Sequence, residues 1–558
     1  MKRPALTRIT GAVLLAALLC LSSCRKPDAD VSSEASSVSS ETSAVPASTS
    51  PSATEEETSV SSEDPSSDTA PLPETDMTVS NMDAAPTVPA AGDLAEELSR
   101  LPGVTKVCRR TTFSEGQYLL YYEMPIDHSD PSKGTFTQRL YLNFKGKDAP
   151  NVFEVGGYNI YYGMYNGDFF DESEPLFSQK YNCNFFEAEY RFDGLSKPEG
   201  FKNTEADYWE YLTCAQASED FHTMIGSLKN IFSGKWCFEG ASKGGEFTTY
   251  YLSSHPEDID LFMAECAMLK LGKNSPGSLD YVYKTAGDDR YGKEQAKKYR
   301  DLLLRFQVEM IKHRDDLQDA YWQRATVYYD QLFAPSMTKE ILFDCTVLDT
   351  RYVFQYDSTD HPAGNLFDRM QEVLDNTDDP SRKQRFINLS LDLLEDMYGP
   401  WQYSYSVGEN TISESDSLNQ YAYFFQCYHE DGYFDYDFSY LRKALEKDGS
   451  GASLYITEEM EPDVYSYRIL ECHRSIPYSP DVVNARIAAV ENTKKPLILL
   501  NGLSDIYQVA EIKECDNPNV HIFNLPESFH DELSLDYLSE EQFKEFDAVV
   551  REALEIPS

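Results

Sequence analysis

Basic residues are scarce in this chain, and their scarcity excludes one large class of partners. Lys and Arg number 49 against 94 Asp and Glu, so the formal net charge is −45. An acidic surface of this size repels phosphate backbones, and we therefore expect no nucleic acid as a partner. The stretch from Pro27 to Gly92 has no Lys or Arg and almost no large apolar residue. Such a segment cannot bury enough surface to offset its chain entropy, so residues 25–95 are predicted to form a disordered tether.

The chain also lacks a C-x-x-C motif and any spacing of His and Cys that is typical of zinc. Of its 11 cysteines, Cys20 and Cys24 fall in the N-terminal segment, and the pairing of the others cannot be taken from their spacing. Cys427-x-His429 and Cys472-His473 suggest a metal but match no zinc pattern. We therefore predict neither a metal nor a cofactor.

The first 24 residues have the pattern of an export signal. Three basic residues precede the apolar run Gly11 to Leu21, which is too short to span a bilayer. The run leads into Leu-Ser-Ser-Cys, which resembles a bacterial lipobox and implies cleavage before Cys24 and acylation of that residue. We expect an exported lipoprotein, anchored by its lipid to the extracytoplasmic side of a bacterial membrane. A plain signal peptide and a trimmed pro-segment in place of the tether are the alternatives.

A nucleophile elbow is the most specific motif in the chain. The apolar run Trp236-Cys237-Phe238 leads into Gly240-Ala241-Ser242-Lys243-Gly244, and a helical pattern follows. A G-x-S-x-G turn between a strand and a helix exposes the serine oxygen above the end of a sheet. We predict that Ser242 is the nucleophile and that the backbone N–H of Lys243 faces the oxyanion. An ordinary Gly/Ser loop is the alternative.

The pattern around this elbow predicts the α/β class. Strands alternate with helices over residues 96–270 and again over 492–558, which favours a mostly parallel, doubly wound sheet. Residues 271–491 are instead dominated by helical patterns such as Lys293 to Arg314, and we predict an inserted helical cap. The elbow and the alternation together indicate an α/β-hydrolase fold. In that fold, the glycine pair after the strand Asn151 to Val155 suits a second oxyanion donor, from Gly157 or Tyr158.

The remaining catalytic residues follow from chain order. An α/β-hydrolase supplies its triad in the order Ser, acid, His. Asp505 follows a buried-looking strand, where it can hold and stabilise an imidazolium. His530 lies in a loop beyond the last strand and is predicted to be the general base, whereas His521 lies inside that strand and is expected to be a packed core residue.

Three stretches resemble a known family. They are Pro125-Ile126-Asp127-His128 with Gln138-Arg139, the run from Glu189 to Pro198, and the elbow from Gly240 to Gly245. Each is similar to secreted tripeptidyl aminopeptidases (prolyl tri/tetrapeptidyl aminopeptidases), which are α/β-hydrolase serine peptidases related to the prolyl carboxypeptidase and dipeptidyl-peptidase II group. The resemblance implies a capped serine aminopeptidase that releases short peptides from the N-termini of peptide substrates, often after proline. The sequence departs from the family at Tyr190, where His is usual, and at Ile506-Tyr507, where Pro-Trp is common.

Two other functions compete with the peptidase interpretation. The same triad attacks esters, so a carboxylic ester hydrolase is the enzyme alternative, although the polar cap has no long apolar lid. A catalytically inactive, surface-binding lipoprotein is the alternative from another class, and the intact set Ser242, Asp505 and His530 counts against it.

The substrate N-terminus needs a carboxylate if its ammonium is to leave water. Glu430 ends an aromatic-rich stretch of the cap and is the candidate that the sequence offers. The alternative is that Glu430 is simply solvent-exposed in an acidic protein.

Overall fold

The computed structural model describes residues 94–109, 116–160, 164–165, 168–169, 175–202, 207–328, 333–356, 365–375, 379–396, 403, 421–526, 528–530 and 535–557. The predicted export signal, Cys24 and nearly all of the predicted tether lie outside these residues. Within the described part of the chain, no helix is both long enough and apolar enough to cross a membrane.

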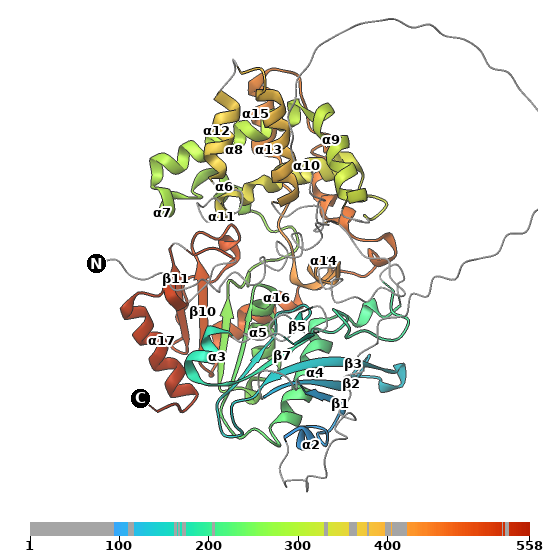
Figure 1. The fold of residues 1–558 in the computed structure, drawn as a ribbon, viewed down its shortest axis with the longest axis vertical. Coiled ribbons are helices and arrows are strands. Elements are labelled where there is room, and N and C mark those ends of the chain that lie inside the picture. The colour runs from blue at the N-terminus through green and yellow to red at the C-terminus, as the bar shows by residue number, and fades with distance from the viewer. Residues whose placement is uncertain are drawn as a thin grey trace, which may run out of the picture.

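A nine-stranded sheet forms the centre of the molecule (Figure 1), in the order β1-β2-β3-β7-β4-β8-β9-β10-β11. The strands β1 to β3 and β7 pair antiparallel, and the neighbours from β7 to β11 pair parallel. This order, with the elbow directly after the central strand β8, is that of an α/β-hydrolase and confirms the predicted fold. The strands are β1 (Val104–Arg109), β2 (Gln117–Pro125), β3 (Thr135–Asn143), β4 (Asn151–Glu154), β7 (Asn184–Ala188), β8 (Trp236–Ala241), β9 (Leu261–Glu265), β10 (Leu497–Gly502) and β11 (Val520–Leu525), and a separate pair is formed by β5 (Met164–Tyr165) and β6 (Asp168–Phe169).

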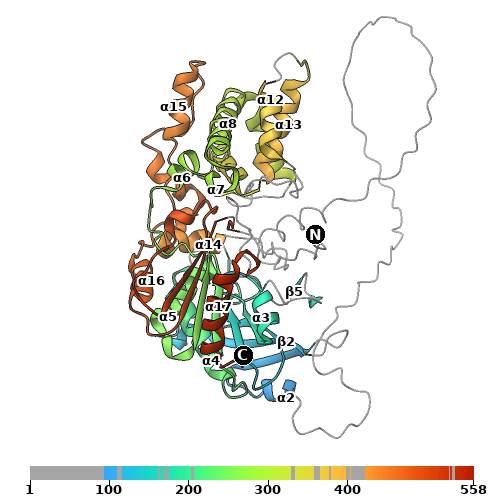
Figure 2. The same ribbon diagram turned by 90° about the vertical axis from the view of Figure 1, so that its left-hand side faces the viewer.

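Helices cover both faces of the sheet (Figures 1 and 2) because its central strands are apolar on both sides. On one face, α4 (Cys214–Leu228), α5 (Lys243–Ser254) and α16 (Asp481–Asn492) share an aromatic core with the strands. On the other face, α3 (Leu176–Tyr181) and α17 (Glu540–Ala553) close a second core. α2 (Leu94–Leu98) packs beside β1 and begins just before the predicted end of the tether.

A layer of helices lies above the sheet and has a hydrophobic core of its own (Figure 1). Below it, α14 (Tyr421–Gln426) packs on the sheet domain, where Phe425 lies 4.7 Å from the Trp209 ring, centroid to centroid. The helices of this layer, which we call the cap, are α6 (Ser278–Lys284), α7 (Asp288–Tyr291), α8 (Lys293–Lys312), α9 (Arg314–Gln323), α10 (Lys339–Asp349), α11 (Val353–Tyr356), α12 (Leu366–Asp375), α13 (Arg382–Asp396) and α15 (Ser439–Asp448).

The cap ends earlier than the predicted boundary at residue 491. The range 271–491 includes nearly all of α16, but Val482 and Val490 of this helix are buried in the core shared with α5. An amphipathic helix shows in its sequence that it has a buried face but not which neighbour covers that face.

Two of the motifs that carry the family resemblance form buried ion pairs. Arg139 on β3 bonds Glu189 with two parallel contacts of 2.8 and 2.6 Å. Arg191 does the same to Asp220 on α4, at 2.7 and 2.8 Å, and His128 contacts that carboxylate as well. Paired, bidentate partners make buried charges tolerable. These contacts therefore tie β3 and α4 to the segment that follows β7.

Candidate active site

The sequence around Ser242 folds into the predicted turn. The buried strand β8 ends at Ala241, and α5 begins at Lys243. Ser242 between them has φ 56° and ψ −120°, a backbone conformation that side chains rarely adopt. A Cβ on Gly244 would lie 1.9 Å from the carbonyl oxygen of Val155, so the turn needs glycine there. The strain at Ser242 is held in place by close packing of β4, β8 and α5.

Three side chains at the carboxyl ends of parallel strands form a continuous hydrogen-bonded chain. Nε2 of His530 lies 2.8 Å from Oγ of Ser242, and its Nδ1 lies 2.7 Å from Oδ2 of Asp505. Asp505 is fully buried and accepts a further bond from the backbone N–H of Tyr507 at 2.7 Å. The structure thus brings together the serine, the imidazole and the carboxylate that the sequence singles out, in the geometry of a Ser-His-Asp triad.

His521, by contrast, lies away from this chain. Its Nδ1 faces Glu545 of α17 at 3.8 Å, and its side chain is about a quarter exposed, 26%. The prediction that His521 is a packed core residue is therefore wrong. It lies on the strand face toward α17, where the long and polar surface of that helix leaves it partly open to solvent.

The predicted oxyanion donors lie side by side. Gly157 follows β4, which neighbours β8 in the sheet, and its φ is +80°. A Cβ on Gly157 would approach Cδ of Lys243 to 2.9 Å, so the loop with Gly157 and Tyr158 crosses directly over the Lys243 side chain. The N-terminus of α5 adds its partial positive charge at the same place. This end of the sheet is suited to an oxyanion beside Ser242.

The Lys243 ammonium lies in a box of tyrosines. Nζ is 4.2 Å from the centroid of the Tyr190 ring, 5.3 Å from that of Tyr158 and 5.9 Å from that of Tyr423. It is buried and has no hydrogen-bond partner in the described part of the chain. Cation–π attraction is strong for such a desolvated ammonium. Lys243 therefore joins the elbow, the Gly157 loop and α14, and one wall of the box is Tyr190, a position at which the sequence departs from the family it resembles.

Buried charges connect α5 to the segment below the cap. Arg486 of α16 bonds Glu246 of α5 at 3.0 Å and also contacts Asp431. Burial raises the pKa of Glu246 to about 8, and the Arg486 guanidinium opposes that rise. The carboxylate of Glu430 accepts from the N–H of Cys214, at the start of α4, at 2.8 Å. Burial, and secondarily Asp431, raises the pKa of Glu430 to about 7.

Glu430 is therefore not the solvent-exposed residue of the alternative prediction, and its carboxylate already accepts a hydrogen bond within the protein. It is half-buried, lies next to Asp431 in a short helix, and accepts from the first N–H of α4, whose N-cap residue is Thr213. The sequence does not indicate Glu246, Arg486 and Asp431 as members of this site. Their grouping joins residues 240 and 55 positions apart in the chain, so no local motif signals it.

Metal ligands are not assembled at the triad. Among the described residues, one group of His and carboxylate side chains is close enough to hold an ion, and it lies at the other end of α5. The motif residues Cys427 and His473 are buried among aromatic rings instead, with His473 bonded to Tyr421 at 2.7 Å.

The strand order defines an α/β-hydrolase fold, and Ser242, His530 and Asp505 lie in the geometry of a catalytic triad. The family described as PS-10 peptidase S37 matches residues 87–379, more than half of the chain, and the chain belongs to that family. The matched range includes Ser242 and ends before Asp505 and His530, which are located by their contacts alone.

A prolyl tri/tetrapeptidyl aminopeptidase from Streptomyces mobaraensis is 30% identical over 239 residues, or 43% of this chain. The matched part spans 45% of that relative's length. Solved structures of similar shape include the alpha/beta hydrolase GrgF from Penicillium sp. sh18 (11% identical, 79% of this chain and 100% of that one, TM-score 0.33). A second is a 2-hydroxy-6-oxo-6-phenylhexa-2,4-dienoate hydrolase from Rhodococcus sp. strain RHA1 (11% identical, 78% and 99%, TM-score 0.28). The fold assignment rests on the strand order rather than on these low scores.

Proposed function

We propose that this protein is a serine exopeptidase that releases short, tripeptide-like peptides from the N-termini of its substrates. The observation that carries the proposal is the hydrogen-bonded chain from Ser242 through His530 to Asp505, in a member of a peptidase family. His530 takes the proton of Ser242 as Oγ attacks the scissile carbonyl, and Asp505 stabilises the imidazolium. His530 then donates that proton to the leaving amine, and water hydrolyses the acyl-enzyme by the reverse sequence.

The backbone around Lys243 completes this mechanism. Its N–H, together with one from the Gly157–Tyr158 loop, would bind the oxygen that becomes negative when the carbonyl is attacked. The support is the close approach of the Gly157 backbone to Lys243. Because these donors belong to a rigid strand–helix junction, they need no rearrangement during the reaction.

Acidic groups on the cap side of the site favour cleavage close to a free N-terminus over cleavage in the middle of a chain. A bound ammonium needs a carboxylate to replace its water. Glu430 is the proposed anchor, and its neighbour Asp431 strengthens the negative potential there. The name of the Streptomyces relative supports a preference for proline and for three or four residues.

The site of action is proposed to be the extracytoplasmic face of a bacterial membrane, with the lipid on Cys24. The support is the sequence of the first 24 residues. Fractionation of cells that express the wild type or Cys24→Ala tests it. The wild type should remain with membranes after a salt wash and the variant should not. A Cys24→Ala protein that stays on the membrane would disprove a lipid anchor at this residue.

Hydrolysis of a substrate panel tests the activity. Purified protein is incubated with tripeptidyl, dipeptidyl and single-residue amides, with an N-acetylated tripeptidyl amide, and with a short acyl ester. The free tripeptidyl amide should be cleaved fastest, and N-acetylation should abolish its cleavage. Efficient turnover of the ester with no amide cleaved would establish an esterase instead, and no turnover of either by a well-folded protein would favour the inactive scaffold.

A further inference from the structure

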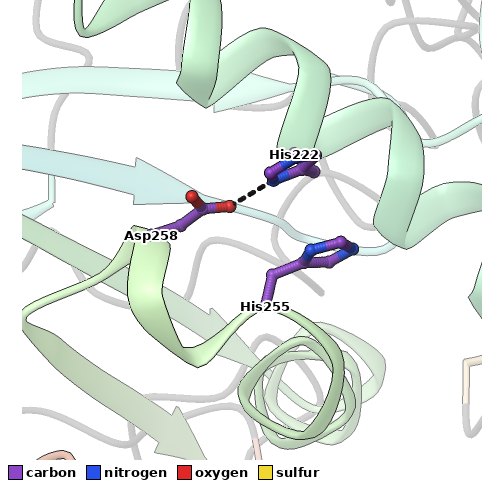
Figure 3. Close-up of side chains that lie close together, drawn as sticks. All are labelled: His222, His255 and Asp258. Atoms are coloured by element: carbon purple, nitrogen blue, oxygen red, sulfur yellow. Dashed lines mark hydrogen bonds and ion pairs between the residues drawn. The ribbon is translucent and has the colours of Figure 1, made fainter.

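Two histidines and an aspartate meet at the end of α5 that is remote from Ser242 (Figure 3). His222 projects from α4, His255 follows the last residue of α5, and Asp258 ends the short 3-10 helix η4 (Pro256–Asp258). The chain has nine histidines, and two of them stack here with ring centroids 4.3 Å apart and planes inclined by 11°. Three separate elements therefore bring chemically matched side chains to one place.

The distances suit a shared ligand. Nδ1 of His222 lies 2.6 Å from Oδ2 of Asp258, and one ligand atom from each of the three residues lies within 4.8 Å of the other two. In a tetrahedral zinc site, bonds of about 2.0–2.2 Å place the ligand atoms roughly 3.3 Å apart. The His222–Asp258 pair would have to open by about 0.7 Å, and atoms near the 4.8 Å limit would have to close by about 1.5 Å. His222 has the freedom to do so because its side chain is 46% exposed.

The stacked rings have to turn before both can bind one ion. Their planes are nearly parallel, inclined by 11°, whereas a metal lies in the plane of each imidazole whose nitrogen lone pair binds it. His222 therefore has to rotate out of the stack and release its contact with Asp258.

Neighbouring groups resemble the outer shell of a metal site. Tyr251 donates its hydroxyl to Oδ2 of Asp258 at 2.7 Å, which fixes the orientation of the carboxylate. Oε1 of Glu219 lies 3.2 Å from Nε2 of His255, within reach as a fourth ligand or as an orienting acceptor. Lys229 approaches the other carboxylate oxygen, at 3.6 Å, and leaves Oδ2 to the imidazole side.

We propose that His222, His255 and Asp258 bind a divalent transition metal, with zinc as the best match. Imidazole nitrogens with a carboxylate suit zinc and its neighbours, whereas calcium and magnesium take all-oxygen sets. The site takes no part in hydrolysis, because the 12 residues of α5 separate it from Ser242 by about 18 Å. The ion ties the end of the nucleophile helix to α4 and stabilises the folded chain.

Zinc titration of the full-length, untagged protein tests the proposal after treatment with a chelator. Isothermal titration with ZnCl₂ should give one saturable site per chain in the micromolar range or tighter, and zinc should raise the thermal midpoint by several degrees. His222→Ala and His255→Ala should each lower the affinity at least tenfold and abolish the thermal shift. An excess of Ca²⁺ should not displace the zinc, since calcium prefers oxygen ligands.

His313→Ala is the matched control. His313 also faces two carboxylates, Asp316 at 3.1 Å and Glu309 at 4.0 Å, but among the described residues no group of metal-binding side chains includes it. Its replacement should leave zinc binding unchanged. Far-UV circular dichroism of each metal-free variant verifies that it is folded. His222→Ala should fold like the wild type, because the His222 side chain is 46% exposed. The proposal is overturned by a wild type without saturable binding, by equal affinity in wild type and His222→Ala, or by displacement with calcium.

Discussion

The sheet and the cap side of the active site differ in how their polar groups are partnered. In the sheet, Ser242, His530 and Asp505 are linked by contacts of 2.7–2.8 Å. Toward the cap, Nζ of Lys243 and Oδ2 of Asp431 are buried and have no hydrogen-bond partner among the described residues. Buried polar atoms without partners are costly, and they gain most when a ligand satisfies them. The difference suggests that the sheet provides the chemistry and that the cap side selects the substrate.

The largest effect should come from the sheet side, through Ser242→Ala. Without the nucleophile, turnover should fall by up to about 10⁶-fold. The fold should stay intact, because Oγ of Ser242 contacts the His530 imidazole rather than the core. Activity on the tripeptidyl amide and labelling by a fluorophosphonate measure the loss. Labelling at another residue, or an active variant, would remove Ser242 from the mechanism.

Replacement of the two C-terminal histidines should separate a catalytic role from a structural one. His530→Ala should be nearly as damaging as the loss of Ser242, because the triad residues act as a unit. His521→Ala should keep full activity and cost little stability, since that side chain is partly exposed. Steady-state kinetics at equal amounts of folded protein measure both variants. An inactive His521→Ala beside an active His530→Ala would reassign the base.

Lys243→Met should show whether the two sides depend on each other. The methionine keeps most of the stem that supports Gly157 but removes the ammonium from its tyrosine box. A desolvated cation–π contact is worth about 2 kcal/mol, so kcat/KM should fall roughly 30-fold if the box positions the oxyanion loop. Lys243→Arg, which keeps the charge, should recover part of the loss. Wild-type kinetics in Lys243→Met would show that the ammonium is dispensable.

Glu430→Gln should act on the cap side alone. Gln can still accept the bond from the Cys214 N–H at the start of α4, so that contact remains while the charge is lost. Peptides with a free N-terminus should be cleaved roughly 10- to 150-fold more slowly, as expected for the loss of a charged contact worth about 1.5–3 kcal/mol. The short acyl ester, which carries no ammonium, should be unaffected. Equal losses on both substrates would place the anchor at another residue of the cap side.

The smallest effect concerns two polar groups inside the sheet that, unlike the triad residues, are not fully hydrogen-bonded. Glu239 of β8 pairs in register with Glu154 of β4, and each has one buried carboxylate oxygen without a hydrogen-bond partner. Burial, and then the charge of Glu265, raises the pKa of Glu239 well above 4.5. The folded state therefore holds a proton that the unfolded chain loses near pH 4.5, and stability should decline as pH rises above that value.

Glu239→Gln should remove part of this decline. The thermal midpoint should rise by about 2–4 °C at pH 8, a change on the order of 1 kcal/mol, and hardly at pH 5. Glu123→Gln, on the exposed side of β2, is the control and should change neither value. Melting curves across this pH range measure the effect. A uniform shift at all pH values would mean that packing, rather than ionisation, distinguishes the variant.

Much of the fold and the core of the site could be predicted from local patterns. The alternation of strands and helices and the elbow around Ser242 depend on neighbours in the chain, so they are visible in sequence. The placement of Asp505 and His530 followed from chain order in the α/β-hydrolase fold, and both residues lie where parallel strands end. The assignments of α16 to the cap and of His521 to the core failed because burial against a distant element leaves no local trace.

The amino-acid sequence by itself determined the nucleophile turn, because glycines at fixed offsets and a short apolar strand suffice to create it. Only the tertiary structure decided which distant charges surround that turn. Arg486 meets Glu246 across 240 residues and Asp431 across 55. Such pairs depend on how helices pack over the sheet. The energy of that packing comes from many contacts across a whole core, so no single sequence motif predicts it.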